Sequence, residues 1–276
     1  FAEEIVIGAA PPSDSFEGFT THNDWDEPVS RAPVVYFYGA FFQGTFTVKV
    51  PSGTFIETWP IPEELISIAP LHLLNSARAV WTFSANSWRE PGTTDISDAR
   101  DQLSFSPELL DIWRRPSSFL LEFDDGASEK FIYYECALTP RNDDDFYPAL
   151  LTDEGTVLDP DYNGELIRFI KVDGKVIIDP ITERYETHRE LQQATEYEDV
   201  FETLCSWAGG TMISDEISAM WTTWGDWIYS GSWSGDTLLV FPLPEETIER
   251  MSSITLETSE EHTIEYSRFY IGIISI

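Results

Sequence analysis

The chain has 276 residues, of which 42% are hydrophobic and 14% aromatic, so it can bury a substantial core. Only 16 Lys and Arg stand against 49 Asp and Glu, and the formal net charge is −33 at pH 7. Affinity for nucleic acid depends on basic groups that displace counterions from phosphates. The composition therefore argues against direct binding to DNA or RNA and against docking on an anionic membrane.

Self-repulsion of this size destabilises a folded chain unless salt screens it over about 10 Å or less. The charge indicates either an extracellular, saline environment or a role in solubility, and both readings stay open. No run of about 18 apolar residues occurs, so we expect no membrane-spanning helix. The chain begins with Phe1, and we expect that it is processed from a larger precursor.

Residues 1–33 are expected to form an extended N-terminal arm. A short β-branched run at 5–7 is followed by a Pro, Ser and Asp-rich stretch at 11–14. The β-branched run needs a strand partner, either in the chain's own sheet or in a neighbouring subunit. We expect residues 34–276 to form a single β-sandwich domain with helical insertions.

The segment 34–50 is rich in β-branched and aromatic residues, which predicts strand structure. Gly39 and Gly44 are expected to mark bends or bulges. We predict a bulge near Gly44, because it would keep Phe46 and Val48 facing the core.

Two short helices and a strand are predicted next. Acidic residues follow a proline at 62–66, as is typical of a helix start. Residues 78–84 predict a strand, and 106–113 predict a short helix with Ser106 as N-cap and Pro107 at its first position.

Two Asp-Gly pairs between apolar runs predict β-hairpins, because this pair accepts positive φ at low cost. The first joins 119–123 to 130–134 at Asp125-Gly126, and the second joins 166–170 to 176–178 at Asp173-Gly174.

The C-terminal third combines helix and strand patterns. Apolar residues at helical spacing predict a helix over 182–207. The tryptophan-rich stretch that follows fits one face of a helix, and its end at 227–233 fits an aromatic strand equally well. Further strands are expected at 237–241, 254–256 and 266–276. Together these patterns predict a mainly β protein, an antiparallel, jelly-roll-like β-sandwich with inserted helices.

One motif fits a cation site. Asp159, Asp161 and Asn163 precede a glycine, in the D-x-D-x-N-G pattern that opens a calcium loop. The match is partial, because Ile170 stands where an EF-hand has a bidentate carboxylate. Either this segment binds calcium or it is a polar turn leading into the second hairpin.

Other polar and aromatic groups have two readings each. The acidic run at 142–145 could hold a hard cation or lie solvated. The tryptophans of 221–233 could form a platform for sugar rings beside a catalytic carboxylate pair, or they could be core residues. Cys136 and Cys205 are expected to be buried thiols and not a disulfide. The histidines show no zinc-binding spacing, and no catalytic residue is assigned.

Two segments carry a resemblance to a known family. Residues 41–49, after the apolar lead 33–36, resemble the aromatic-Arg-Gly-Ser element of picorna-like jelly-roll capsid proteins, a group that includes those of marine RNA viruses and dicistroviruses. In this chain Gln43 replaces the Arg and Thr45 replaces the Ser. Residues 237–244 resemble the late strand of those subunits that ends in a proline-containing turn.

The resemblance implies an eight-stranded sandwich that assembles into an icosahedral shell. The expected function is therefore that of a structural capsid subunit, whose partners are other capsid subunits or copies of itself and whose location is the virion. The alternative is a secreted β-sandwich protein that binds or hydrolyses carbohydrate. Assembled particles would indicate the first function, and a monomer that cleaves glycans would indicate the second.

Overall fold

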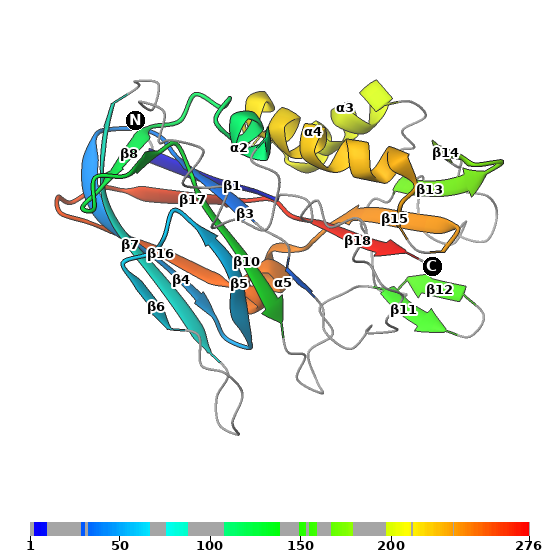
Figure 1. Ribbon diagram of the computed structural model, residues 1–276, viewed down its shortest axis with the longest axis horizontal. Helices are drawn as coiled ribbons and strands as arrows, with labels where there is room; N and C mark the ends of the chain where they lie inside the picture. The colour runs from blue at the N-terminus through cyan, green and yellow to red at the C-terminus, as the bar shows by residue number, and fades with distance from the viewer. Residues whose placement is uncertain are drawn as a thin grey trace.

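The computed structural model describes residues 3–9, 29–30, 33–66, 76–87, 108–138, 149–152, 155–158, 167–178, 197–210, 212–233 and 235–275. The predicted fold class is confirmed, because the protein is mainly β and consists of antiparallel sheets packed together. Figure 1 shows the sheets with a layer of helices along one side of the molecule.

Two six-stranded sheets form the sandwich, and we call them sheet A and sheet B. In sheet A the strand order is β17-β1-β3-β10-β2, with β5 also paired to β10. In sheet B the order is β16-β4-β7-β8-β9, with β6 also paired to β7. The strands of sheet A are β1 (Glu3–Ala9), β2 (Val29–Ser30), β3 (Pro33–Phe37), β5 (Gly53–Trp59), β10 (Ile132–Leu138) and β17 (Ile264–Arg268). Those of sheet B are β4 (Phe42–Val50), β6 (Glu64–Ile66), β7 (Ala77–Ser87), β8 (Leu120–Phe123), β9 (Ser128–Glu129) and β16 (Ser253–Thr258).

The chain crosses repeatedly between the two sheets, and this buries one face of each. Strands β3, β4, β5 and β7 alternate between sheet A and sheet B. In sheet B the late strand β16 lies beside β4, so β16, β4, β7 and β8 follow the 4-1-2-3 order of a Greek key. The core between the sheets is aromatic and aliphatic, and its fully enclosed side chains include Phe37, Phe46, Trp81, Phe83 and Phe241.

The N-terminal strand pairs within its own chain. β1 runs parallel to β17 on one side and antiparallel to β3 on the other. The sequence left two strand partners open for this segment, the chain's own sheet or a neighbouring subunit. In the structure its partner is the chain's own sheet.

β4 is regular, and the bulge predicted near Gly44 is wrong. Its residues pair with β7 without interruption, and Phe46 and Val48 face the core at strict period two. Gly44 has a different role, because a Cβ there would lie 2.8 Å from the carbonyl oxygen of Glu257. The glycine permits close approach of β16.

The helix predicted at 62–66 is also wrong, because the chain forms the edge strand β6 there. Leu65 pairs with Ala79 and Ile66 with Arg78 of β7. This short acidic segment lacks a sustained helical spacing of apolar residues. Pairing with the edge of sheet B is therefore favoured over the helix that the local start signal indicates.

The two Asp-Gly turns form as predicted, but only the second hairpin does so completely. Asp173 and Gly174 both have positive φ, and β13 and β14 pair across them. Across the first turn β8 pairs with the two-residue β9 and not with β10, because the chain crosses to sheet A after β9 and continues there as β10.

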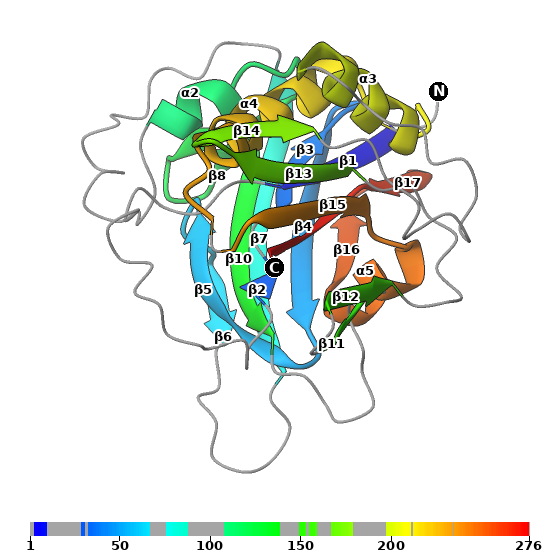
Figure 2. The ribbon, with the colours of Figure 1, turned by 90° about the vertical axis from the view of Figure 1, so that its right-hand side faces the viewer.

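A third sheet, with the order β14-β13-β15-β18, extends from the sandwich and packs under the helices. Figures 1 and 2 show α2, α3 and α4 together on this side of the molecule. The strands are β13 (Ile167–Val172), β14 (Lys175–Ile178), β15 (Thr237–Pro242) and β18 (Ile271–Ser275), and β11 (Ala149–Thr152) pairs separately with β12 (Gly155–Leu158). The helices are α2 (Glu108–Trp113), α3 (Tyr197–Trp207), α4 (Ser214–Ser230) and α5 (Glu245–Met251).

The tryptophan-rich stretch is helical, which decides between its two readings. α4 ends at Gly231, whose φ of 67° gives the left-handed C-cap that glycine favours. Its buried face, including Trp221 and Trp224, packs on Phe169 and Leu238 of the third sheet. The predicted helix at 106–113 is present as α2, whereas Ser106 and Pro107 lie outside the described residues.

Candidate functional site

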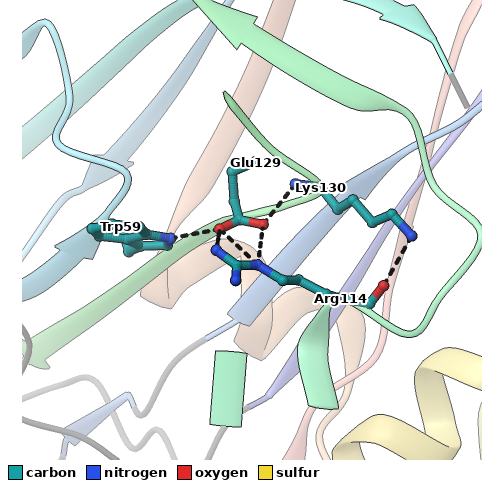
Figure 3. A network of polar contacts seen from close by, with 4 residues as sticks. All are labelled: Trp59, Arg114, Glu129 and Lys130. Atoms are coloured by element: carbon teal, nitrogen blue, oxygen red, sulfur yellow. Dashed lines mark hydrogen bonds and ion pairs between the residues drawn. The ribbon is translucent and has the colours of Figure 1, made fainter. Parts of the chain in front are cut away.

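A buried polar network lies at one corner of the sandwich, where β5, α2 and β9 meet (Figure 3). Glu129 is completely buried, and its carboxylate accepts a hydrogen bond of 3.0 Å from the indole N–H of Trp59. Arg114 donates from Nη2 at 2.6 Å and from Nε at 3.0 Å to the same carboxylate. The backbone N–H of Lys130 adds a further bond of 2.9 Å, and the Lys130 ammonium reaches the Arg114 carbonyl at 3.0 Å.

This network stabilises the corner and is unsuited to acid–base chemistry. Burial lowers the pKa of the Arg114 guanidinium, but the hydrogen bonds and negative charge of Glu129 outweigh that effect and raise the pKa above its ordinary value. Both oxygens of Glu129 already accept charge-assisted or N–H bonds. The pair therefore fixes the end of β5 against the residues after α2.

Exposed aliphatic side chains lie on β5, on β6 and on the connection between these two strands. Ile56 of β5, Ile61 of the connection, and Leu65 and Ile66 of β6 are exposed by 52%, 61%, 49% and 39%. We call the segment 53–66 the β5–β6 edge. Figure 2 shows β5 and β6 along the same side of the sandwich. Exposed aliphatic residues on edge strands are candidates for contact with another protein.

The β5–β6 edge is held firmly from inside. Phe55 packs against the sandwich core, and Trp59 is buried at the end of β5. The indole N–H of Trp81 donates a hydrogen bond of 2.8 Å to the carbonyl oxygen of Pro60. The exposed aliphatic side chains therefore project from a fixed backbone.

The segment that carries these aliphatic side chains is acidic in sequence, but Arg78 of β7 pairs across from Ile66. The segment 51–66 contains Glu57, Glu63 and Glu64 and no Lys or Arg. Arg78 lies 3.6 Å from Glu64, and both side chains are more than 40% exposed, so this pair contributes little to stability. The exposed apolar groups of β6 thus lie beside both acidic residues and Arg78.

The sequence-predicted calcium residues Asp159, Asp161 and Asn163 lie outside the described residues, as does the acidic run at 142–145. Within the part of the chain that the structure describes, His, Cys, Asp and Glu form no group of three or more that could hold a metal ion. The calcium site stays a prediction.

Two tryptophans of α4 are core residues, and the third, Trp227, is partly buried against the same cluster, so they do not form a surface platform. Trp221 and Trp224 are buried, and Trp233, beyond the helix, is buried with them. Lys171 lies over the Trp233 ring at 4.1 Å and donates to the carbonyl oxygen of Gly235. This cation–π contact closes the end of α4 over the third sheet.

Both cysteines are free thiols, as predicted, but only Cys136 is also buried as predicted. Cys136 is buried in sheet A, and burial raises its pKa well above the ordinary value. Cys205 is half-buried on α3, and burial, followed by the charge of Glu202, raises its pKa. Neither thiol has the lowered pKa of a nucleophile.

A second buried carboxylate supports the helix layer. Glu216, in the first turn of α4, accepts a hydrogen bond of 2.5 Å from the Tyr38 hydroxyl and one of 3.1 Å from the backbone N–H of Ile213. Burial and the adjacent Glu216 raise the pKa of Tyr38 far above its ordinary range. This arrangement caps α4 and joins it to the residues after β3.

The comparisons with known proteins give no relative. No protein-family model matches the chain, and no curated protein or solved structure matches it. Among the helices that the structure describes, none has the length and apolar character needed to cross a membrane.

Sequence reasoning missed the β5–β6 edge. In β5, Phe55 and Ile56 are adjacent, and only Phe55 faces the core, so Ile56 breaks the alternation expected of a half-buried strand. This out-of-phase isoleucine was the available signal. Because a helix was expected at 62–66, the sequence did not predict the strand that carries Leu65 and Ile66.

Proposed function

We propose that the protein is a structural subunit of a larger assembly, an icosahedral viral capsid, and that it associates through exposed sheet edges. The observation that carries this proposal is the exposure of Ile56, Ile61, Leu65 and Ile66 on edge strands of a chain with a net charge of −33. Aliphatic groups in such a polar surface are typical of surfaces that another protein covers.

The antiparallel sandwich is consistent with this function, because layered β domains of this kind form shells through their edges and loops. The resemblance of residues 41–49 and 237–244 to picorna-like capsid subunits adds support. The acidic surface implies that a sibling subunit with basic groups contacts any enclosed nucleic acid. On this proposal the protein is located in the virion.

Calcium belongs to the same proposal. Asp159, Asp161 and Asn163 would supply oxygen ligands of the kind that Ca²⁺ prefers, and a divalent ion would reduce repulsion between acidic subunits. Substitution of both aspartates by Asn should abolish any calcium-dependent rise in melting temperature. An equal rise in variant and parent would contradict this part of the proposal.

The function is tested by the state in which the chain occurs in its natural source. After isolation without dissociating agents, the chain should sediment with particles far heavier than its own 31.4 kDa, together with sibling subunits. Electron microscopy should show closed shells in the same fraction. Recovery as a free 31.4 kDa chain that releases reducing ends from glycans would contradict the proposal and favour the carbohydrate alternative.

A further inference from the structure

We propose that Tyr266 and Arg268 of β17 seal the outer edge of β16, and that this seal keeps a second copy of the chain from adding a strand to sheet B there. The inference goes beyond the proposed function, because it concerns the side of the sandwich opposite the β5–β6 edge. It rests on hydrogen bonds from the side chains of β17 to the main chain of Ser252 and Leu256.

The main-chain groups of β16 point alternately toward sheet B and away from it. In the part of the chain that the structure describes, β16 pairs with β4 and is the last strand of sheet B. The N–H of Ser259, just after β16, donates a bond of 2.8 Å to the carbonyl oxygen of Gln43 in β4. Odd-numbered residues of this segment therefore turn their N–H and C=O groups toward β4, and even-numbered residues turn theirs outward.

Two of the outward main-chain groups are bonded by side chains of β17. The N–H of Leu256 donates a bond of 2.9 Å to the hydroxyl oxygen of Tyr266. The carbonyl oxygen of Ser252 accepts a bond of 2.8 Å from Nη2 of Arg268. Tyr266 thus supplies an acceptor and Arg268 supplies a donor, which are the two kinds of group that a neighbouring strand would offer.

The course of the chain explains how β17 reaches this edge. A turn at 259–263 leads from β16 in sheet B to β17 in sheet A, so the two successive strands belong to different sheets (Figure 1). The main chain of β17 pairs with β1, which leaves its side chains to contact β16. Tyr266 and Arg268 are two residues apart and therefore project from the same face of β17.

The two halves of the seal differ in how firmly they are held. The Arg268 side chain is 3% exposed, donates a second bond of 2.8 Å to the Ser252 hydroxyl and lies over the Tyr270 ring at 5.7 Å. Tyr266 is 41% exposed. The hydroxyl bond of Tyr266 is therefore the part of the seal that a single substitution can open.

A second copy of the chain is the partner that the seal excludes. An edge strand with open N–H and C=O groups is a template for the same strand of another molecule, and two β16 edges could pair antiparallel about a two-fold axis. Each copy carries a formal charge of −33, but at 1 M salt the repulsion is screened within about 3 Å. At high salt the main-chain groups themselves must therefore be closed.

Tyr266→Phe tests the seal, because it removes the hydroxyl and keeps the ring. Amide hydrogen exchange is measured at low protein concentration and low salt, where the chains repel one another. The amide of Leu256 should exchange about tenfold faster in the variant than in the parent, as expected for the loss of one hydrogen bond. The amides of Phe46 in β4 and Trp81 in β7 should exchange as in the parent, which shows that the sandwich remains folded.

Sedimentation velocity at about 1 M salt then tests association. Tyr266→Phe should form heavier species than the parent at the same concentration, and the amides of 253–258 should be protected again in those species. Glu265→Gln is the matched control, because Glu265 is the exposed neighbour of Tyr266 and its side chain projects from the opposite face of β17. The control should sediment as the parent does.

Three results would overturn the inference. Unchanged exchange of Leu256 in Tyr266→Phe would show that the hydroxyl does not close this N–H. Faster exchange without additional association at high salt would show that the seal is not what keeps copies apart. Association without protection of 253–258 would place the contact elsewhere. A chain that occurs naturally as a free monomer would contradict only the proposed function, because the seal does not depend on it.

Discussion

Each side of the sandwich has an arginine in an ion pair, but the two ion pairs differ in how exposed the carboxylate is. On the β5–β6 side, Arg114 and Glu129 form a pair in which the two side chains are 12% and 1% exposed. On the opposite side, Arg268 of β17 is 3% exposed, whereas its partner Glu249 of α5 is 52% exposed. The outer surfaces also differ, because β16 and β17 expose polar residues and one tyrosine, Tyr266, whereas the β5–β6 edge exposes four aliphatic residues.

This difference indicates which side of the sandwich is suited to contact with water. A polar edge with a half-exposed ion pair is stable in water without a partner. The β5–β6 side has exposed aliphatic side chains next to an ion pair whose carboxylate is buried, as we would expect of a side that a partner covers. The comparison therefore supports the assignment of association to the β5–β6 side.

The largest expected effect is that of removing the enclosed carboxylate. Glu129→Ala leaves the Arg114 guanidinium buried without its partner and the Trp59 indole N–H without an acceptor. We expect a loss of about 3–5 kcal/mol in the free energy of unfolding, measured by denaturant titration. The double variant Glu129→Leu with Arg114→Met should recover much of this loss. A loss below about 1 kcal/mol for Glu129→Ala would contradict the structural role of the network.

High pH should destabilise both sides of the sandwich. Burial raises the pKa of Tyr36 and Tyr134 well above the ordinary value of 10.0, so the folded state keeps protons that the unfolded state releases. Their contribution to stability is fully present below pH 10 and is lost as the pH rises above it, by up to about 1.4 kcal/mol per pH unit for each tyrosine. Tyrosinate absorbance and circular dichroism should therefore change together. Ionisation of every tyrosine near pH 10 without unfolding would contradict the burial.

A third prediction concerns the start of β5. A Cβ at Gly53 would lie 2.2 Å from the carbonyl oxygen of Ala137 in the neighbouring β10. Gly53→Ala should therefore cost about 1–3 kcal/mol of stability, because the backbone of an inner strand cannot move away freely. Thr54→Ala at the next position is the control and should cost less. Equal thermal melting of parent and Gly53→Ala would contradict the close pairing of these strands.

The smallest expected effect is on the opposite side. Glu249→Ala removes a carboxylate that is half exposed, and Arg268 keeps two bonds of 2.8 Å to the carbonyl and hydroxyl oxygens of Ser252. We expect a loss below about 1 kcal/mol that decreases further in high salt. A loss as large as that of Glu129→Ala would remove the contrast between the two sides.

Local patterns predicted much of the fold. Runs of β-branched residues identified β4, β7 and β15, and the Asp173-Gly174 turn was read correctly, because each of these signals acts within one or two strands. The sequence could not show that β10 leaves its hairpin to join sheet A, since strand partners far apart in the chain depend on tertiary packing.

The candidate site was less predictable than the fold. Arg114 and Glu129 are separated from Trp59 by more than fifty residues, and nothing local marks them as partners. The sequence around Leu65 and Ile66 has neither a helical nor a strand pattern. These residues form an edge strand only because they pair with β7. The predicted residues Asp159, Asp161 and Asn163 lie outside the described residues, so the structure does not bear on them.

Hydrogen–deuterium exchange of the native assembly tests the central claim most directly. The backbone amides of 53–66 are compared in intact particles and in the dissociated chain, with 253–268 on the opposite side as the reference. We expect 53–66 to exchange at least about tenfold more slowly in the particle, because contact with another subunit would cover this segment and oppose its local opening. Equal exchange of 53–66 in both states, with protection confined to other surfaces, would contradict the assignment of this edge to subunit contact.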